Sequence, residues 1–136
     1  MRPERRTPGS PADWLRYARS DLALARGRRK RGVLQSTLCY HAHQAAEKSL
    51  KAVLLAASIP FPYTHDLARL ITLVRGAGLR WPGSLDAALK LTEYAVSSRY
   101  PGISTEVTAK ERLEAVKVAR CVLGWARQEL KALPRR

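Results

Sequence analysis

The chain has 136 residues, of which 46% are hydrophobic and 7% aromatic. This length and the abundance of alanine, leucine, arginine and lysine favour one domain with a single core and an all-α fold. Its 25 lysines and arginines against 11 acidic residues give a formal charge of +14, which indicates an anionic partner (nucleic acid, a nucleotide, an acidic protein or a lipid surface) or simply a basic solvated surface.

Neither a membrane span nor a secretion signal is visible in the sequence. No stretch approaches the roughly 18 consecutive apolar residues that span a bilayer. The arginine-rich start is followed by Ser10, Pro11 and Asp13, where a signal peptide has its apolar segment. Cys39 and Cys121 are the only cysteines and lie in apolar helical patterns, so we expect two core residues without a disulfide. A cytoplasmic protein is therefore expected.

Five helices are predicted, and together they predict an antiparallel up-down four-helix bundle with one additional short helix, in a single domain of residues 10–133. Residues 1–9 lack apolar periodicity and are predicted to form a mobile basic arm. Ser10 is the expected N-cap of the first helix, with Pro11 at its first position. This helix is predicted to run to about Lys30, ending in the basic segment GRRKRG. Its expected buried residues are Trp14, Leu15, Ala18, Leu22 and Ala25.

The second helix is expected from about Val33 to Ala57. It ends there because a residue that precedes a proline, here Pro60, is pushed out of the α region. Thr64 is the expected cap of a third helix that ends at the Gly-Ala-Gly segment, residues 76–78. The third helix presents an apolar face of Leu67, Leu70, Ile71 and Val74.

The fourth and fifth helices are separated by a loop that starts at Arg-Tyr-Pro-Gly. Ser84 is the expected cap of the fourth helix, which stops before Pro101. Thr108 and Glu111 have the spacing of a capping box, so they predict the start of a last helix that runs to about Leu133. Its expected apolar residues are Leu113, Val116, Ala119, Leu123 and Trp125.

The segment YHAHQAAEKSLKA, residues 40–52, holds two of the three histidines. Residues two apart on a helix stand about 200° apart, so His41 and His43 cannot share a metal ion. We expect each to be partly buried and to donate to a backbone or hydroxyl group. The alanine-rich arc between them lets a second helix approach closely, within the bundle or across a dimer. A helical wheel places the remaining polar residues on one solvent-facing stripe: Tyr40, Gln44, Glu47, Lys48 and Lys51.

The same segment, followed by THDL at residues 64–67 and by SRYPG at residues 98–102, resembles the HEPN family of small helical-bundle proteins. The resemblance covers nearly all of residues 10–133 in order and spacing. It implies an up-down four-helix bundle with one shorter helix, homodimerisation, and ties to RNA or nucleotide chemistry. It also implies pairing with a small nucleotidyltransferase in a context like that of toxin-antitoxin systems.

Many members of this family are metal-independent ribonucleases that carry an R-x(4–6)-H motif. None of the three histidines here follows an arginine at that spacing, and Arg99 is followed at the corresponding positions by Ser104, Thr105 and Glu106. Arginine does not exchange protons usefully at neutral pH. The sequence therefore predicts a non-catalytic module without a metal or cofactor.

We expect this module to bind a nucleotide or an RNA phosphate. Arg99 is suited to grip a phosphate bidentately, and Tyr100 is suited to stack on a base. Lys48, Lys51 and His65 are the other expected contacts. Each of the five also has a structural interpretation: an ion pair for the arginine, packing for the tyrosine, solvated charges for the lysines and a helix-start hydrogen bond for the histidine.

Three alternatives stay open at this point. A diverged ribonuclease would combine Arg99 with His41, His43 or His65 brought from elsewhere in the fold or from a second subunit. GRRKRG and the terminal arginines would make a sequence-independent polyanion footprint, or GRRKRG is simply a solvated helix C-terminus. A scaffold that docks to an acidic protein would use the same charge.

Overall fold

The computed structural model describes residues 9–97, 101 and 106–133. Within these ranges it contains α-helices, one 3₁₀ helix and no strand, which confirms the predicted all-α fold. Apart from Gly9, the predicted basic arm lies outside the described residues. The elements are α1 (Pro11–Arg26), α2 (Gln35–Ala56), α3 (Leu67–Gly76), η1 (Gly83–Leu91), α4 (Thr92–Ser97) and α5 (Ala109–Ala132).

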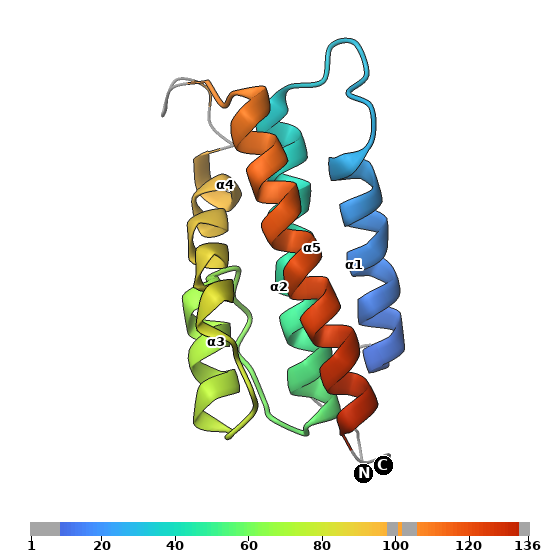
Figure 1. Cartoon of the computed structure of the whole chain (residues 1–136), viewed down its shortest axis with the longest axis vertical. Coiled ribbons are helices and arrows are strands. Elements are labelled where there is room, and N and C mark those ends of the chain that lie inside the picture. Colours follow the sequence, from blue (N-terminus) through green and yellow to red (C-terminus); the bar gives the residue numbers. More distant parts are fainter. Residues whose placement is uncertain (1–8, 98–100, 102–105, 134–136) are drawn as a thin grey trace.

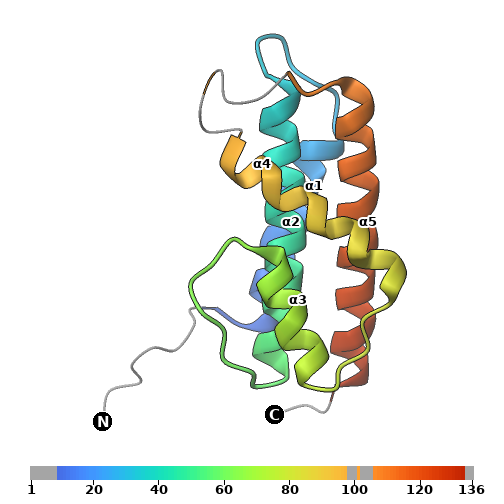
Figure 2. The ribbon, with the colours of Figure 1, turned by 90° about the vertical axis from the view of Figure 1, so that its left-hand side faces the viewer.

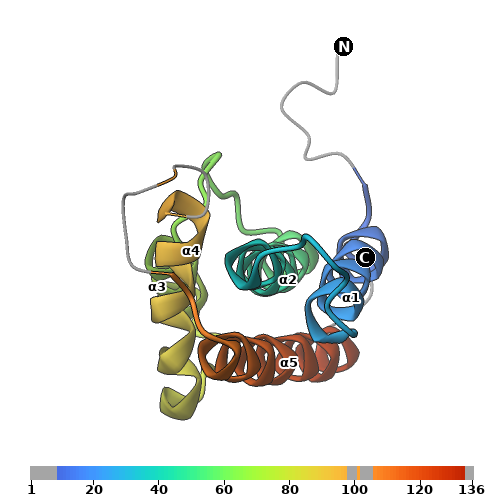
Figure 3. The same ribbon diagram turned by 90° about the horizontal axis from the view of Figure 1, so that it is seen from above.

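The long elements alternate in direction along the chain. Figures 1 and 2 show α1 running towards one end of the molecule, α2 running back, η1 with α4 returning, and α5 running back again. The short helix α3 lies beside α2, which also packs against α1, α4 and α5. Viewed along the bundle, α2 lies in the middle of the other elements (Figure 3). This is an up-down four-helix arrangement with one short extra helix.

The alanine-rich arc of α2 is used inside the bundle. Ala42, Ala45 and Ala46 are fully buried and belong to one core with residues of α1 and α5. Because a methyl group occupies little space, neighbouring helices approach α2 on several sides. Of the two alternatives for this arc, packing within one chain is therefore the one that the fold uses.

The predicted Ser10 N-cap and the predicted capping box of Thr108 and Glu111 are confirmed, and Ser10 also forms a capping box with Asp13. The Ser10 hydroxyl accepts from the backbone N–H of Asp13 at 3.1 Å, and the Asp13 carboxylate accepts from the Ser10 N–H at 3.0 Å. Thr108 and Glu111 form the same reciprocal pair, with both bonds at 3.1 Å. Each box satisfies two N–H groups that a helix start leaves without a partner.

The predicted end of the first helix is wrong by about one turn. α1 ends at Arg26 with Gly27 as its C-cap, and the segment up to Lys30 is not helical. If the helix continued, Arg26 would lie beside the like charges of Arg29 and Lys30, three and four residues further on. Arg112 of α5 holds this end of the bundle together. Its guanidinium donates to the backbone oxygen of Ala25 at 3.0 Å and to the side chain of Gln35 at 2.7 Å, which joins the end of α1 to the start of α2.

The caps predicted for the third and fourth helices are also wrong. Asp66, rather than Thr64, caps α3, and its carboxylate accepts from the N–H of Ala68 at 3.0 Å. Ser84 makes no cap bond, because the expected fourth helix begins as the 3₁₀ helix η1 and becomes α-helical only at Thr92. The apolar residues explain the 3₁₀ turn, since a period of three places on one face Leu85, Ala88 and Leu91.

Two predicted core residues are exposed. Cys39 is buried as expected, and burial raises the pKa of its thiol to about 11. Cys121 and Leu113 of α5 instead face solvent. Both lie on the side of α5 that no other described helix covers. Among the described residues, none of the helices combines the length and apolar character that crossing a bilayer requires.

Candidate functional site

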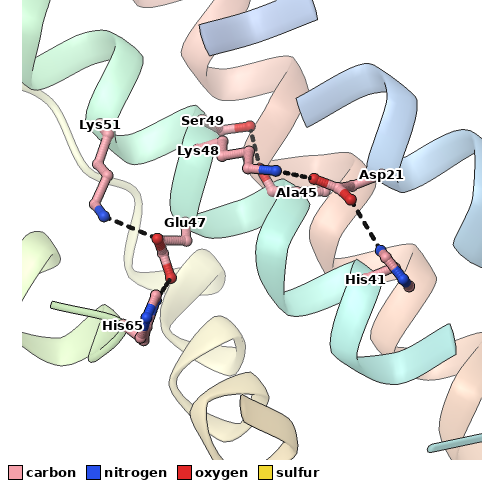
Figure 4. A network of polar contacts seen from close by, with 8 residues as sticks. All are labelled: Asp21, His41, Ala45, Glu47, Lys48, Ser49, Lys51 and His65. Carbon is pink, nitrogen blue, oxygen red and sulfur yellow. Dashed lines mark hydrogen bonds and ion pairs between the residues drawn. The ribbon is translucent and has the colours of Figure 1, made fainter. Parts of the chain in front are cut away.

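Only part of the polar stripe predicted on α2 faces solvent. Glu47 and Lys51 are only 3% and 5% exposed, so this prediction is wrong for both. The Lys51 ammonium donates to one oxygen of Glu47 at 2.8 Å, and Nδ1 of His65 donates to the other at 2.7 Å (Figure 4). Each carboxylate oxygen therefore has a partner, which offsets the cost of burying its charge.

Aromatic rings close over the Lys51 ammonium. Its nitrogen lies 5.8 Å from the ring centroid of Trp14, 5.7 Å from that of Phe61 and 5.9 Å from that of Tyr63. These are cation–π distances. The last two rings belong to the loop of residues 57–66, which covers the lysine. Lys51 is therefore a structural cation and is not available to a phosphate.

His43 ties the same loop to α2. Its Nε2–H donates to the backbone oxygen of His65 at 2.8 Å, which confirms the predicted bond to a backbone group. Nδ1 then carries the lone pair and is buried without a hydrogen-bond partner among the described residues. Burial lowers the pKa of His43, because the charged imidazolium is poorly solvated inside the protein. The side chain is therefore a neutral structural histidine.

A second carboxylate, that of Asp21, joins α1 to α2. Asp21 accepts from Nδ1 of His41 at 2.9 Å and from the Lys48 ammonium at 2.6 Å (Figure 4). The two donors are seven residues apart on α2 and so share a face. His41 is partly buried as predicted, but its partner is a carboxylate instead of a backbone or hydroxyl group.

A groove of about 470 Å³ lies beside Lys48, on the surface of α1. Tyr17 is 54% exposed there. The guanidinium carbon of Arg16 lies 5.0 Å from the centroid of the Tyr17 ring, and the Lys48 nitrogen lies 5.9 Å from it. An exposed ring flanked by two cations is suited to a base next to a phosphate. The lining residues are Gly9, Asp13, Trp14, Arg16, Tyr17 and Lys48.

The site residues predicted from the sequence are dispersed. Lys48 lines the groove, and both Lys48 and His41 donate to Asp21. The network around Glu47 contains the other three: Lys51, His43 and His65. The predicted phosphate and stacking residues, Arg99 and Tyr100, lie outside the described residues.

Sequence reasoning missed the α1 side of the groove. Arg16 and Tyr17 lie off the apolar face of α1, and a wheel of that helix marks them as exposed. Nothing in the sequence indicates that Tyr17 lies beside Lys48, because the contact depends on how α1 and α2 are aligned.

In the described ranges, no three histidine, cysteine, aspartate or glutamate side chains gather closely enough to hold a metal ion.

Comparisons with known proteins agree with the fold. The HEPN domain family model matches residues 11–130. The crystal structure of an archaeal HEPN homologue is similar to this chain at 25% sequence identity, with a TM-score of 0.69 over 90% of this chain and 98% of that one. No curated protein matches the sequence significantly.

Removing the buried carboxylate is expected to destabilise the protein. Glu47→Leu leaves the Lys51 ammonium buried without its counter-ion, which costs about 3–5 kcal/mol of unfolding free energy. The double variant Glu47→Leu/Lys51→Met removes both charges and should recover most of that loss. Urea unfolding measures both. A double variant no more stable than Glu47→Leu would show that the pair is not the buried charge we describe.

His43 is expected to make the protein sensitive to acid. Its pKa is lowered on folding, so below the unfolded value of about 6.5 the unfolded chain binds the extra proton. Stability is therefore retained above about pH 6.5 and falls below it, by at most about 1.4 kcal/mol per pH unit for one proton. Urea unfolding of wild type and His43→Gln, from about pH 7 to about pH 5, measures this difference. Equal losses in the two proteins would contradict it.

Proposed function

Because the chain belongs to the HEPN domain family, we propose that it is a binding module for a nucleotide or for RNA phosphates, and that the α1/α2 groove is its binding surface. One observation carries the proposal: the exposed Tyr17 ring has the guanidinium of Arg16 on one side and the Lys48 ammonium near it. A base stacks on such a ring, and its phosphate reaches a neighbouring cation.

The polar groups around the groove fit this role. Asp21 holds the Lys48 ammonium at 2.6 Å, which fixes its position while its remaining N–H bonds stay available to a phosphate. The Arg16 side chain is largely exposed, and its ion pair with Asp13 is a loose one at 3.6 Å. The formal charge of +14 adds long-range attraction for a polyanion.

Family membership supports two further parts of the proposal. We propose that the chain forms a homodimer and works with a partner nucleotidyltransferase, as in toxin-antitoxin pairs. The alanine-rich arc of α2 is not the dimer surface, because Ala42, Ala45 and Ala46 are already buried within one chain. The module is non-catalytic in this proposal, since the R-x(4–6)-H spacing is absent from the sequence.

A diverged ribonuclease is a second candidate, and the pair of Asp21 and His41 favours it. A carboxylate on Nδ1 fixes the tautomer that leaves the Nε2 lone pair as a proton acceptor. RNA incubated with the protein in EDTA separates the two candidates. The binding-module proposal expects intact RNA, whereas fragments that disappear with His41→Ala would establish the ribonuclease.

Truncating Tyr17 is expected to weaken RNA binding. Loss of one stacked base costs about 1–3 kcal/mol, so Tyr17→Ala should bind a labelled single-stranded RNA of about 12 nucleotides roughly 5- to 150-fold more weakly. Tyr17→Phe keeps the ring and should bind like wild type. Fluorescence polarisation at a fixed salt concentration measures all three affinities.

The matched control for this experiment is Tyr63→Ala. Tyr63 is 92% exposed but lies in the loop over Lys51, outside the groove. Its loss should leave RNA affinity within about threefold of wild type. Equal weakening by Tyr17→Ala and Tyr63→Ala, or no weakening by either, would remove the α1/α2 groove as the binding surface.

A further inference from the structure

A second groove, of about 460 Å³, lies between α1 and α5. Figure 1 shows the two helices side by side in opposite directions, so that α1 begins at the end where α5 finishes. The residues that line the groove come from this end of both helices. It differs from the α1/α2 groove because its apolar residues are leucines and none of its lining residues is aromatic. The lining residues are Leu15, Arg19, Arg127, Leu130, Lys131 and Leu133.

The charged side chains that line this groove are all basic. None of the six lining residues is acidic. Arg19, Arg127 and Lys131 are exposed, and none of them takes part in an ion pair within the described part of the chain. In the α1/α2 groove, by contrast, Asp21 lies on Lys48. The α1/α5 groove therefore offers three positive charges to a ligand from outside.

The apolar part of the groove selects against a nucleobase. Bases bind by stacking on aromatic rings, whereas Leu130 and Leu133 present partly exposed aliphatic side chains beside the buried Leu15. Aliphatic side chains of another helix pack well on such a surface, since a groove between two helices accepts the ridge of a third. The ligand that satisfies both the leucines and the cations is an amphipathic helix with leucines on one face and carboxylates beside them.

We infer that the α1/α5 groove docks an acidic, leucine-bearing helix of a partner protein. The ends of the chain itself are unsuitable occupants, because residues 1–8 contain three arginines against one glutamate and residues 134–136 contain two arginines. A second copy of the chain is an unsuitable occupant of this groove, because α1, α2, α3 and α5 each carry more basic than acidic residues and none supplies an acidic face. This inference does not depend on RNA binding at the α1/α2 groove.

A designed peptide tests the inference directly. The probe is a fluorescein-labelled peptide of about 18 residues with leucines at helical spacing and glutamates beside them. The comparison peptide has the same composition in scrambled order, so it keeps the charge but loses the leucine face. With the full chain at about 150 mM salt, we expect the amphipathic peptide to bind at least about tenfold more tightly by fluorescence polarisation. Equal affinity of the two peptides would overturn the inference.

Charge reversals locate the binding site. Arg127→Glu should weaken binding of the amphipathic peptide about tenfold or more. Arg69→Glu makes the same charge change on the exposed surface of α3, so its affinity should stay within about threefold of wild type. Lys131→Glu provides a second groove variant, and circular dichroism verifies that each variant is folded. Equal weakening by Arg127→Glu and Arg69→Glu would overturn the inference.

An RNA competition distinguishes the two classes of partner. A single-stranded RNA of about 12 nucleotides should bind Arg127→Glu only slightly less well than wild type, in proportion to the lost charge. The inference is overturned if that RNA displaces the peptide and Arg127→Glu abolishes RNA binding, because the groove would then belong to a nucleic acid.

Discussion

The Glu47 carboxylate lies inside the protein with one oxygen on the Lys51 ammonium and the other on Nδ1 of His65. A buried carboxylate is tolerated only when its oxygens are paired. Lys51 is one turn further along the same helix, so it is available as soon as α2 forms. His65 has to be brought by the loop of residues 57–66, and the rest of the arrangement on this side of α2 follows from that requirement.

The position of this loop determines what surrounds it. With His65 on Glu47 and its backbone oxygen on His43, the chain enters α3 beside α2. Phe61 and Tyr63 then lie over the Lys51 ammonium, and Trp14 of α1 completes the ring of aromatics. One buried charge therefore couples α1, α2 and the start of α3, although these segments are far apart in the sequence.

The same network withdraws Lys51, His43 and His65 from the candidate binding surface, whereas Lys48 lines the α1/α2 groove. Lys51 and His43 are buried, and Nδ1 of His65 donates a hydrogen bond to Glu47. The two grooves border α1: Tyr17 and Arg16 line the groove towards α2, and Arg19 lines the groove towards α5. The two borders differ in chemistry, since one offers aromatic rings and the other offers leucines with basic side chains.

Local features of the fold were predictable from the sequence, because they depend on residues close together in the chain. The Ser10 N-cap and the Thr108 capping box are examples. On α1, four of the five residues expected to be buried are buried: Leu15, Ala18, Leu22 and Ala25. A helical wheel of α2 gives the direction of Glu47 but not what lies opposite, so it placed Glu47 and Lys51 in solvent. The predicted Ser84 cap failed because a period of three and a period of 3.6 are hard to distinguish over three apolar residues. The grooves were unpredictable, since they arise only where α1 meets α2 and α5.

Photocrosslinking tests the central claim most directly, namely that RNA lies on the α1/α2 groove. A short single-stranded RNA containing 4-thiouridine is irradiated with the full chain, and the crosslinked peptides are identified by mass spectrometry. The account predicts crosslinks to Trp14, Tyr17 or Lys48, which line the groove. Crosslinks confined to residues 98–105, where the sequence alone places Arg99 and Tyr100, would contradict it.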